Sequence, residues 1–302
     1  MLAFNHLVFI EVAKHLSFTK AADTLFISQP AISKHIRNLE EHYKTPLFDR
    51  KKGIVSLTEA GKILQHHLLV ASSLTKQIEF DIGSIHHKHL LKGELRLGAS
   101  TTIALYIIPA VLSAFRKKNR AVKISLLNRN SENVMEALIG HEIDLAITEG
   151  KDKMANVNSE YFLTEKVVAV CSSKSYLTKK HKYTLKELKD IPISLRERGS
   201  GTLAAISAAL LAHDIKIVDL NICMRLGGTE ALKNFILADD SLGFLPLKAV
   251  SKELERGELV RLEIENLAID RHFYFIQRLG DKNSGINKEF IKFAKNHYNL
   301  LL

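Results

Sequence analysis

The first 45 positions of this 302-residue chain carry three short runs of apolar residues with helical spacing. In each run apolar side chains recur at steps of three and four, which predicts a helix with one buried stripe. Ser17 and Ser28 precede the second and third runs as candidate N-caps, and Pro30 falls in a first turn, where its missing N–H costs nothing. The predicted stripes are Phe9, Val12, Ala13 and Leu16; Phe18, Ala21, Ala22 and Leu25; and Ile32, Ile36, Leu39 and Tyr43.

The third predicted helix carries a polar face opposite its apolar stripe. Two helices joined by a turn of about four residues, the second with such a face, fit the major groove of DNA. Gln pairs with adenine, while Lys, Arg and Ser reach guanine edges or phosphates. The alternative is a trihelical scaffold whose polar side is simply solvated, and this helix alone does not decide between the two. The face consists of Gln29, Pro30, Ser33, Lys34, Arg37 and Asn38, within a helix-turn-helix over about 18–37.

The next segment, LFDRKKGIVSLTEAG (47–61), consists of two short runs separated by a basic tip with Gly53, which predicts a β-hairpin. The tip holds Arg50, Lys51 and Lys52, suited to a phosphate backbone or a minor groove. A basic hairpin directly after a helix-turn-helix is typical of a wing, so the sequence favours DNA binding over a solvated scaffold.

A long helix is predicted from Thr58, its candidate N-cap, to about His89, because this stretch has no proline. Its apolar residues follow steps of four and three, which average the 3.5-residue repeat of a coiled coil. The alternative is a single helix packed on its own domain. The predicted dimer seam consists of Leu64, Leu68, Ala71, Ile78, Ile82 and Ile85, interrupted by Thr75.

From residue 93 onward, strand-like and helix-like segments alternate, which predicts an α/β domain with mostly parallel strands. Two successive series of this kind predict two lobes with a cleft between them. Candidate ligand-binding residues stand where predicted strands give way to helices, since free N–H groups there bind anions. They are Ser100, Thr101, Thr102, Thr148, Ser200, Gly201, Thr202 and Thr229, with Arg196 and Arg198 as nearby cations that either contact the ligand or lie on the surface.

Composition excludes several classes of protein. The chain is 46% hydrophobic and 25% charged, as in a globular protein, and no window resembles a membrane span or a secretory signal, so we expect a cytoplasmic location without membrane contact. The net charge of +10 is spread along the chain and does not by itself indicate nucleic acid.

Chemical motifs are few. The histidines at 66, 67, 86, 87 and 89 lack the partners of a structural metal site, and no phosphate loop or catalytic triad is present. We therefore expect no metal, no cofactor and no catalytic residues, with an α/β enzyme as an unfavoured alternative. A redox-responsive regulator acting through Cys171 and Cys223 is a second alternative, although both cysteines fall in strand-like segments typical of a buried core.

Residues 17–61 resemble the winged helix-turn-helix of LysR-type transcriptional regulators. The resemblance implies that Gln29, Pro30, Ser33 and Arg37 lie at the DNA surface, with Arg50 in the wing. It further implies a homodimer, assembled as a dimer of dimers, on a pseudo-palindromic operator. The motifs that carry the resemblance are Ala21-Ala22, Ser28-Gln29-Pro30-Ala31, Ser33, Leu39-Glu40, Pro46-Leu47-Phe48 and Leu57-Thr58-Glu59-Ala60-Gly61.

More loosely, residues 91–302 resemble the effector-binding module of that family, a two-lobed α/β domain like a periplasmic solute-binding protein. The implied ligand is a small anionic metabolite held between the lobes. RERGSGT (196–202) also resembles a branch that regulates carbon fixation and sulfur metabolism, although Leu203 replaces the arginine often found next in that branch. The expected domains are 1–58 (winged helix-turn-helix), 59–90 (linker helix) and 91–302 (effector domain), with lobe I at 91–164 and 267–302 and lobe II at 165–266.

Overall fold

The computed structural model describes residues 2–51, 54–86, 91–149, 157–279 and 285–299. The chain divides into two compact units, Met1–His89 and Leu90–Leu302. No helix in the described ranges is both long enough and apolar enough to cross a membrane.

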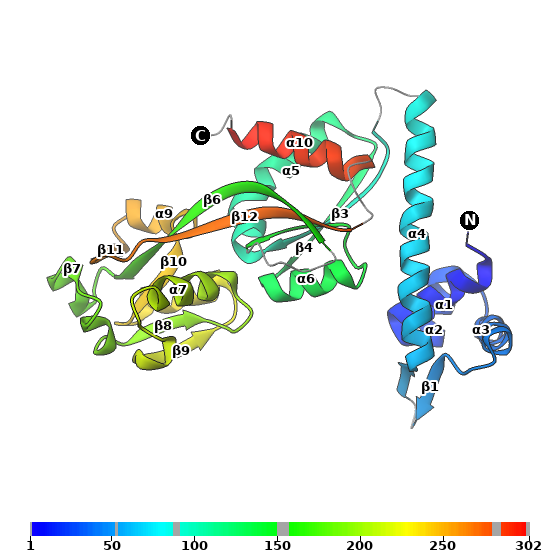
Figure 1. Ribbon diagram of the computed structural model, residues 1–302, viewed down its shortest axis with the longest axis horizontal. Coiled ribbons are helices and arrows are strands. Elements are labelled where there is room, and N and C mark those ends of the chain that lie inside the picture. Colours follow the sequence, from blue (N-terminus) through cyan, green and yellow to red (C-terminus); the bar gives the residue numbers. More distant parts are fainter. Residues whose placement is uncertain (1, 52–53, 87–90, 150–156, 280–284, 300–302) are drawn as a thin grey trace. The chain divides into compact units, whose positions relative to one another are not determined.

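The first unit is a helical core with a two-stranded hairpin (Figure 1). The predicted caps are present: Ser17 Oγ accepts from the Lys20 N–H, and Ser28 Oγ accepts from the Ala31 N–H. Thr58 Oγ1 caps the long helix by accepting from the Gly61 N–H at 3.0 Å. The elements are α1 (Phe4–His15), α2 (Phe18–Leu25), α3 (Gln29–Tyr43), β1 (Phe48–Lys51), β2 (Ile54–Leu57) and α4 (Glu59–His86).

The predicted stripes of the first three helices form one buried core, with two exceptions at helix ends. Leu16 was predicted inside, but it is the C-cap of α1 in left-handed conformation and is exposed. Tyr43, the last residue of α3, is also exposed because the chain leaves the core there. The interior stripe positions are buried because they face the neighbouring helices.

The long helix α4 corrects part of the predicted seam. Leu68 is only 6% exposed and belongs to the core of the first unit, and Leu64 packs against that same core. These two leucines therefore face their own domain, which is the alternative that the sequence left open for the start of this helix. The exposed apolar side chains of α4 are instead Ile63, Val70, Leu74, Ile78 and Ile82.

The second unit is built on one ten-stranded mixed sheet with the strand order β4-β3-β5-β12-β6-β10-β8-β9 and β11 and β7 off that path. Its strands are β3 (Gly93–Ser100), β4 (Val122–Arg129), β5 (Leu145–Glu149), β6 (Val157–Ser172), β7 (Lys182–Tyr183), β8 (Ile193–Arg196), β9 (Ile222–Leu226), β10 (Leu242–Pro246), β11 (Leu259–Ile264) and β12 (Ile269–Arg278). Its helices are α5 (Ile108–Lys118, preceded by a π-turn at Ile103–Ile107), α6 (Ser131–Ile139), α7 (Gly201–Leu211), α8 (Thr229–Ala238), α9 (Leu247–Glu255) and α10 (Gly285–Asn299); short 3-10 turns occupy Tyr176–Lys179, Glu187–Lys189 and Ile217–Asp219.

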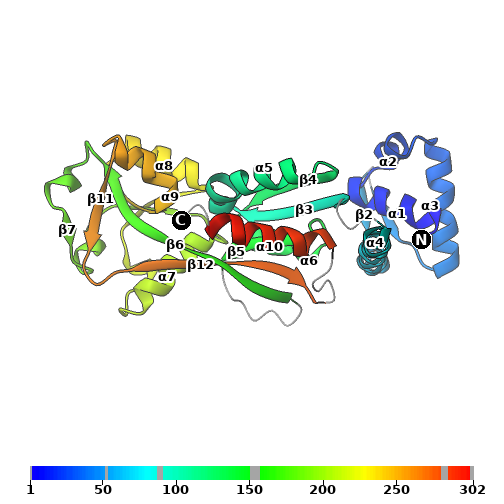
Figure 2. The same ribbon diagram turned by 90° about the horizontal axis from the view of Figure 1, so that it is seen from above.

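Two long antiparallel strands, β6 and β12, run side by side along the middle of this unit (Figures 1 and 2). On one side of them β3, β4 and β5 are parallel, and on the other β8, β9 and β10 are parallel. The expectation of mostly parallel strands thus holds within each half, while the two central strands are antiparallel. They make the halves continuous because both strands take part in each.

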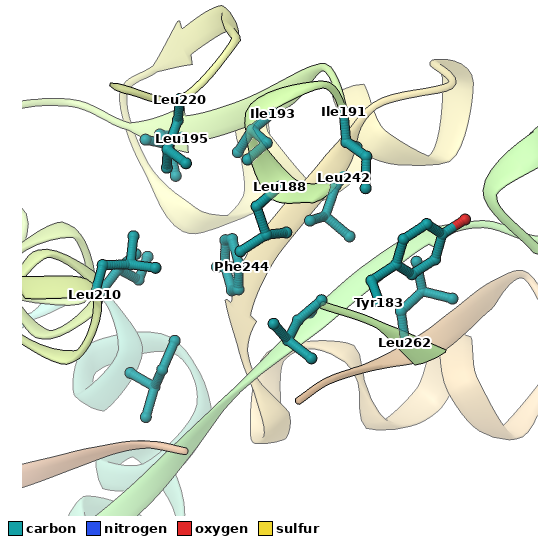
Figure 3. Packing of buried hydrophobic residues seen from close by; sticks show 14 of the residues in the cluster. Tyr183, Leu188, Ile191, Ile193, Leu195, Leu210, Leu220, Leu242, Phe244 and Leu262 are labelled. Carbon is teal, nitrogen blue, oxygen red and sulfur yellow. The ribbon is translucent and has the colours of Figure 1, made fainter. Parts of the chain in front are cut away.

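Each half has its own apolar core. Figure 3 shows the core of the second half, where Leu188, Ile193 and Phe244 pack among side chains from several strands and from α7. Ile269 at the start of β12 belongs to this core, so β12 begins in the second half. A separate cluster around α6, including Val134 and Ile143, fills part of the first half. Each half is therefore a packed lobe in its own right.

Candidate functional site

The polar face of α3 is open to solvent. Gln29, Lys34 and Arg37 are exposed, and Ser33 is partly exposed. The Gln29 side-chain amide donates to Ser33 Oγ at 3.1 Å, so these two side chains, one helical turn apart, form one polar group. The buried stripe on the opposite side fixes how this face is presented, and the exposed groups match the donors and acceptors on base edges.

The hairpin that follows is fixed to the same core. Glu40 accepts from the backbone N–H groups of Leu47 and Phe48, which holds the turn between α3 and β1. The Arg50 guanidinium carbon lies 4.0 Å from the centre of the Phe18 ring, a cation–π contact with the core, and the residue is otherwise exposed. Lys52 and the Lys51 side chain lie outside the described residues.

A small polar cavity lies in the second unit between side chains of both lobes. Its volume is about 10 Å³, room for about one water-sized sphere. Both predicted segments meet there, the first from the end of β3 and the second from the start of α7. The lining residues are Ser100, Thr101, Thr102, Asn130, Ser131, Glu149, Arg196, Ser200, Gly201 and Thr202.

A buried arginine from β12 lies behind this cavity. Arg271 is 2% exposed, donates from both terminal nitrogens to Thr102 Oγ1 at 3.2 Å, and pairs with Glu149. Burial lowers its pKa to about 9, because a charge is costly where water is excluded. The Glu149 carboxylate also accepts from the hydroxyls of Ser131 and Thr148.

A second arginine approaches from the other lobe. Arg196 is 2% exposed and donates to Thr229 Oγ1 at 2.6 Å and to both carboxylate oxygens of Glu197. Burial, the largest single effect, raises the pKa of Glu197, but the hydrogen bonds and charge of Arg196 together with backbone N–H groups bring the pKa below its usual value. Arg196 is thus a cavity residue with its own counter-ion, whereas Arg198 is exposed.

Several hydrogen bonds join the two lobes around the cavity. The Glu132 N–H donates to the Gly199 carbonyl at 3.3 Å, and the Asn130 side-chain amide donates to the Arg198 carbonyl at 3.5 Å. Tyr106 donates to Glu230, and burial, followed by this contact, raises the pKa of the tyrosine. These contacts join the two lobes beside the cavity.

Two buried polar atoms, one lining the cavity and one on the arginine behind it, have no hydrogen-bond partner within the described part of the chain. They are the Ser100 hydroxyl oxygen and the Nε of Arg271. A buried polar group without a partner costs about 1–3 kcal/mol, so such groups are usually satisfied by a bound molecule or by water. Ser200, which starts α7, does not cap that helix with its side chain. An ordinary capping role therefore does not account for it.

The structure brings six of the eight predicted ligand-binding residues together: Ser100, Thr101, Thr102, Ser200, Gly201 and Thr202. The other two stand one hydrogen bond behind the lining, Thr148 next to Glu149 and Thr229 next to Arg196.

Sequence reasoning did not single out Asn130, Ser131, Glu149 or Arg271. The sequence did contain a signal for Arg271. It lies two residues from each of the apolar residues Ile269 and Phe273, and in a strand such positions point to the same side.

The two cysteines occupy different settings, which corrects the prediction that both are buried. Cys171 is buried, and burial raises the pKa of its thiol to about 11. Cys223 is exposed, because it lies on β9 at the end of the sheet. A thiol with a raised pKa is a poor redox sensor, so Cys171 does not support the redox alternative. Among the described residues, no cluster of His, Cys, Asp or Glu is placed to hold a metal ion.

Comparison with known proteins gives two family matches. Residues 5–62 match the model described as "Bacterial regulatory helix-turn-helix protein, lysR family", and residues 88–299 match "LysR substrate binding domain". The transcriptional activator CmpR of Synechocystis sp. is 29% identical over 290 residues, which cover 96% of this chain and 93% of CmpR.

Solved structures are similar as well. The regulatory domain of CcmR from Synechocystis PCC6803, in complex with 2-PG, is 27% identical with a TM-score of 0.62, covering 68% of this chain and 97% of that domain. Full-length OxyR from Pseudomonas aeruginosa, solved as a cysteine-to-aspartate variant, is similar in fold, with a TM-score of 0.72 at 18% identity, over 98% of this chain and 97% of that one.

Proposed function

The chain belongs to the LysR family of bacterial transcriptional regulators, and from that premise we propose that it binds a pseudo-palindromic operator as a dimer and a small anion between its lobes. It is a DNA-binding regulator and not an enzyme, and its partners are double-stranded DNA and a small-molecule effector. Because promoter DNA is its target, we place its action in the cytoplasm.

At the operator, α3 enters the major groove. Gln29, Ser33 and Arg37 face base edges, and Pro30 lies at the DNA surface beside the helix start. Lys34 and the wing residues Arg50, Lys51 and Lys52 contact the phosphate backbone or the minor groove. Support comes from the exposure of the α3 face and from the Glu40 contacts that hold the hairpin beside it.

The dimer forms through the exposed apolar side of α4. Ile63, Val70, Leu74 and Ile78 lie within about 80° around the helix at 3.6 residues per turn. Large apolar side chains so aligned on a helix are typical of a partner surface. From the predicted seam, Ile78 and Ile82 remain in this proposal beside the partly buried Ala71, and Ile85 has no described side chain. Two such dimers assemble on one operator.

The effector site is the cavity between the lobes. One observation carries this proposal: Ser100 Oγ, which lines the cavity together with the first residues of α7, is buried without a partner among the described residues, as is Arg271 Nε behind the lining residue Thr102. Unpaired donors and a helix N-terminus both favour an anionic group. The similar CcmR domain forms a complex with 2-PG, which makes that compound the first candidate to test.

The experiment is a thermal-shift assay of the purified full-length protein with 2-PG, phosphate and a panel of organic acids. Anions should raise the melting temperature of the wild type without being turned over. Thr102→Val and Thr202→Val should each weaken binding by about 1–3 kcal/mol, because valine keeps the shape but leaves a ligand oxygen unpaired. Operator affinity without ligand should be unchanged.

Thr178→Val serves as the matched control. This threonine lies in a 3-10 turn away from the cavity, and its hydroxyl donates to the Ser175 carbonyl of the same turn. A cation or an uncharged aromatic as the best ligand, with Thr102→Val still responsive, would show that the anion site is wrongly assigned.

A further inference from the structure

The cavity contains a carboxylate where an anion would bind. Glu149 ends β5 and lines the cavity, and its oxygens accept from Ser131, Thr148 and Arg271. It also packs directly on the first residue of α7: a methyl group on Gly201 would overlap the Glu149 carboxyl group. The glycine at this position therefore lets the carboxylate of one lobe approach the helix N-terminus of the other.

Each of the two buried arginines at this site is paired with a partly buried glutamate. Arg271 pairs with Glu149, and Arg196 pairs with Glu197. These four side chains leave no net positive charge for a ligand. Attraction for an anion must therefore come from the α7 N-terminus and from the hydroxyl donors around it.

A ligand in this cavity meets hydroxyls and amides that can donate, and a carboxylate that can only accept. Glu149 is the one carboxylate among the described lining residues. An oxyanion with no proton would place its lone pairs and its negative charge against this carboxylate. Because the Glu149 side chain is only 10% exposed, water screens the repulsion poorly. An oxyanion or hydroxy acid that carries an O–H can instead donate a short, charge-assisted hydrogen bond to it.

We propose that Glu149 sets the ligand class of this site, selecting anions that carry a hydrogen-bond donor, such as protonated phosphates or hydroxy acids, over donor-free anions such as sulfate. The inference rests on the effector site proposed above and adds its selectivity. Glu149 thus acts as a specificity residue that accepts a hydrogen bond from the ligand, while the hydroxyls of Ser100, Thr102 and Thr202 donate hydrogen bonds to the ligand.

The test compares tetrahedral anions of similar size by isothermal titration calorimetry on the full-length protein. At slightly alkaline pH, phosphate and sulfate carry nearly the same charge, but only phosphate keeps a proton. The wild type should bind phosphate at least about tenfold more tightly than sulfate, because a site built around one hydrogen bond rejects the analogue that lacks it. Arsenate against selenate repeats the comparison with a second pair.

Glu149→Gln has nearly the same shape but carries no charge and offers N–H donors. It should reduce the preference for phosphate to about twofold or less and strengthen sulfate binding. Glu142→Gln is the matched control, because Glu142 is an exposed carboxylate paired with Arg129, and it should leave the ratio unchanged. If Glu149→Gln does not fold, the phosphate-to-sulfate and arsenate-to-selenate affinity ratios of the wild type still test the proposed selectivity.

Each result has a distinct meaning. Sulfate binding to the wild type as tightly as phosphate, or a ratio that Glu149→Gln does not change, would overturn the selectivity while leaving the anion site in place. Failure of all four anions and of 2-PG to bind would instead remove the effector site itself, and the selectivity with it.

Discussion

At the scale of single residues, Gln29 and the wing lysines are expected to act differently on DNA. Gln29→Ala should cost about 1–3 kcal/mol at the operator and relax the preference at one base position, because the amide reads a base edge. Lys51→Ala should weaken binding to all DNA sequences similarly and should reduce the dependence of affinity on salt, because it removes a phosphate contact. Binding of each variant to the operator and to single-base variants of it, over a series of salt concentrations, measures both effects. An unchanged base preference in Gln29→Ala would mean that α3 is oriented differently.

Residue by residue, the sequence predicts hydroxyls at helix starts well and buried charges poorly. Ser100, Thr102 and Thr202 follow from local rules, since each lies beside a strand end or a helix start. Arg271 and Glu149 do not, because they meet only through the pairing of β12 with β5, between segments far apart in the chain. Arg196 was visible in the sequence, but its burial depends on Thr229 and Glu197 around it.

At the scale of elements, α4 shows why a periodic pattern does not name its partner. Steps of three and four place Leu64 and Leu68 on one side of the helix, but that side packs on the helix-turn-helix core. Farther along, where the core ends, the exposed apolar residues include Leu74 and Ile78. Periodicity predicted the helix and its cap correctly; the division of its surface between two partners requires the tertiary structure.

The exposed apolar side of α4 can be tested by mutation. Leu74→Asp combined with Ile78→Asp should split the dimer, because it brings like charges together in an apolar interface. Operator affinity should fall with it, since each half-site would then be held by one module. Analytical ultracentrifugation measures the assembly. Val218→Asp, an equally drastic change at an exposed position of the second unit, should leave the dimer intact.

Leu68→Ala should behave differently from the double variant. It should destabilise the first unit by about 2–5 kcal/mol, because a core leucine is lost. Thermal unfolding of the variant beside the wild type measures this loss.

A dimer that persists in Leu74→Asp/Ile78→Asp would exclude this face of α4 as the interface.

At the scale of the whole molecule, we propose that the arrangement of the two lobes couples the ligand cavity to DNA binding. Contacts such as Glu132–Gly199 and Tyr106–Glu230 join the lobes beside a cavity of about 10 Å³. We propose that binding of a larger anion exchanges some of these contacts between the lobes for contacts with the ligand. An effector can shift the equilibrium between two arrangements of the lobes only if it binds one of them more tightly than the other. Its hydrogen bonds inside the cavity supply that difference in affinity.

The most direct test of this account is a DNA footprint of the full-length protein on the sequence flanking its own gene, titrated with phosphate, 2-PG and organic acids. We expect protection of two half-sites about one helical turn apart. An anion should change the extent of protection by the wild type and should have no such effect on Thr102→Val. A footprint that no anion changes, or one that changes equally in Thr102→Val, would contradict it.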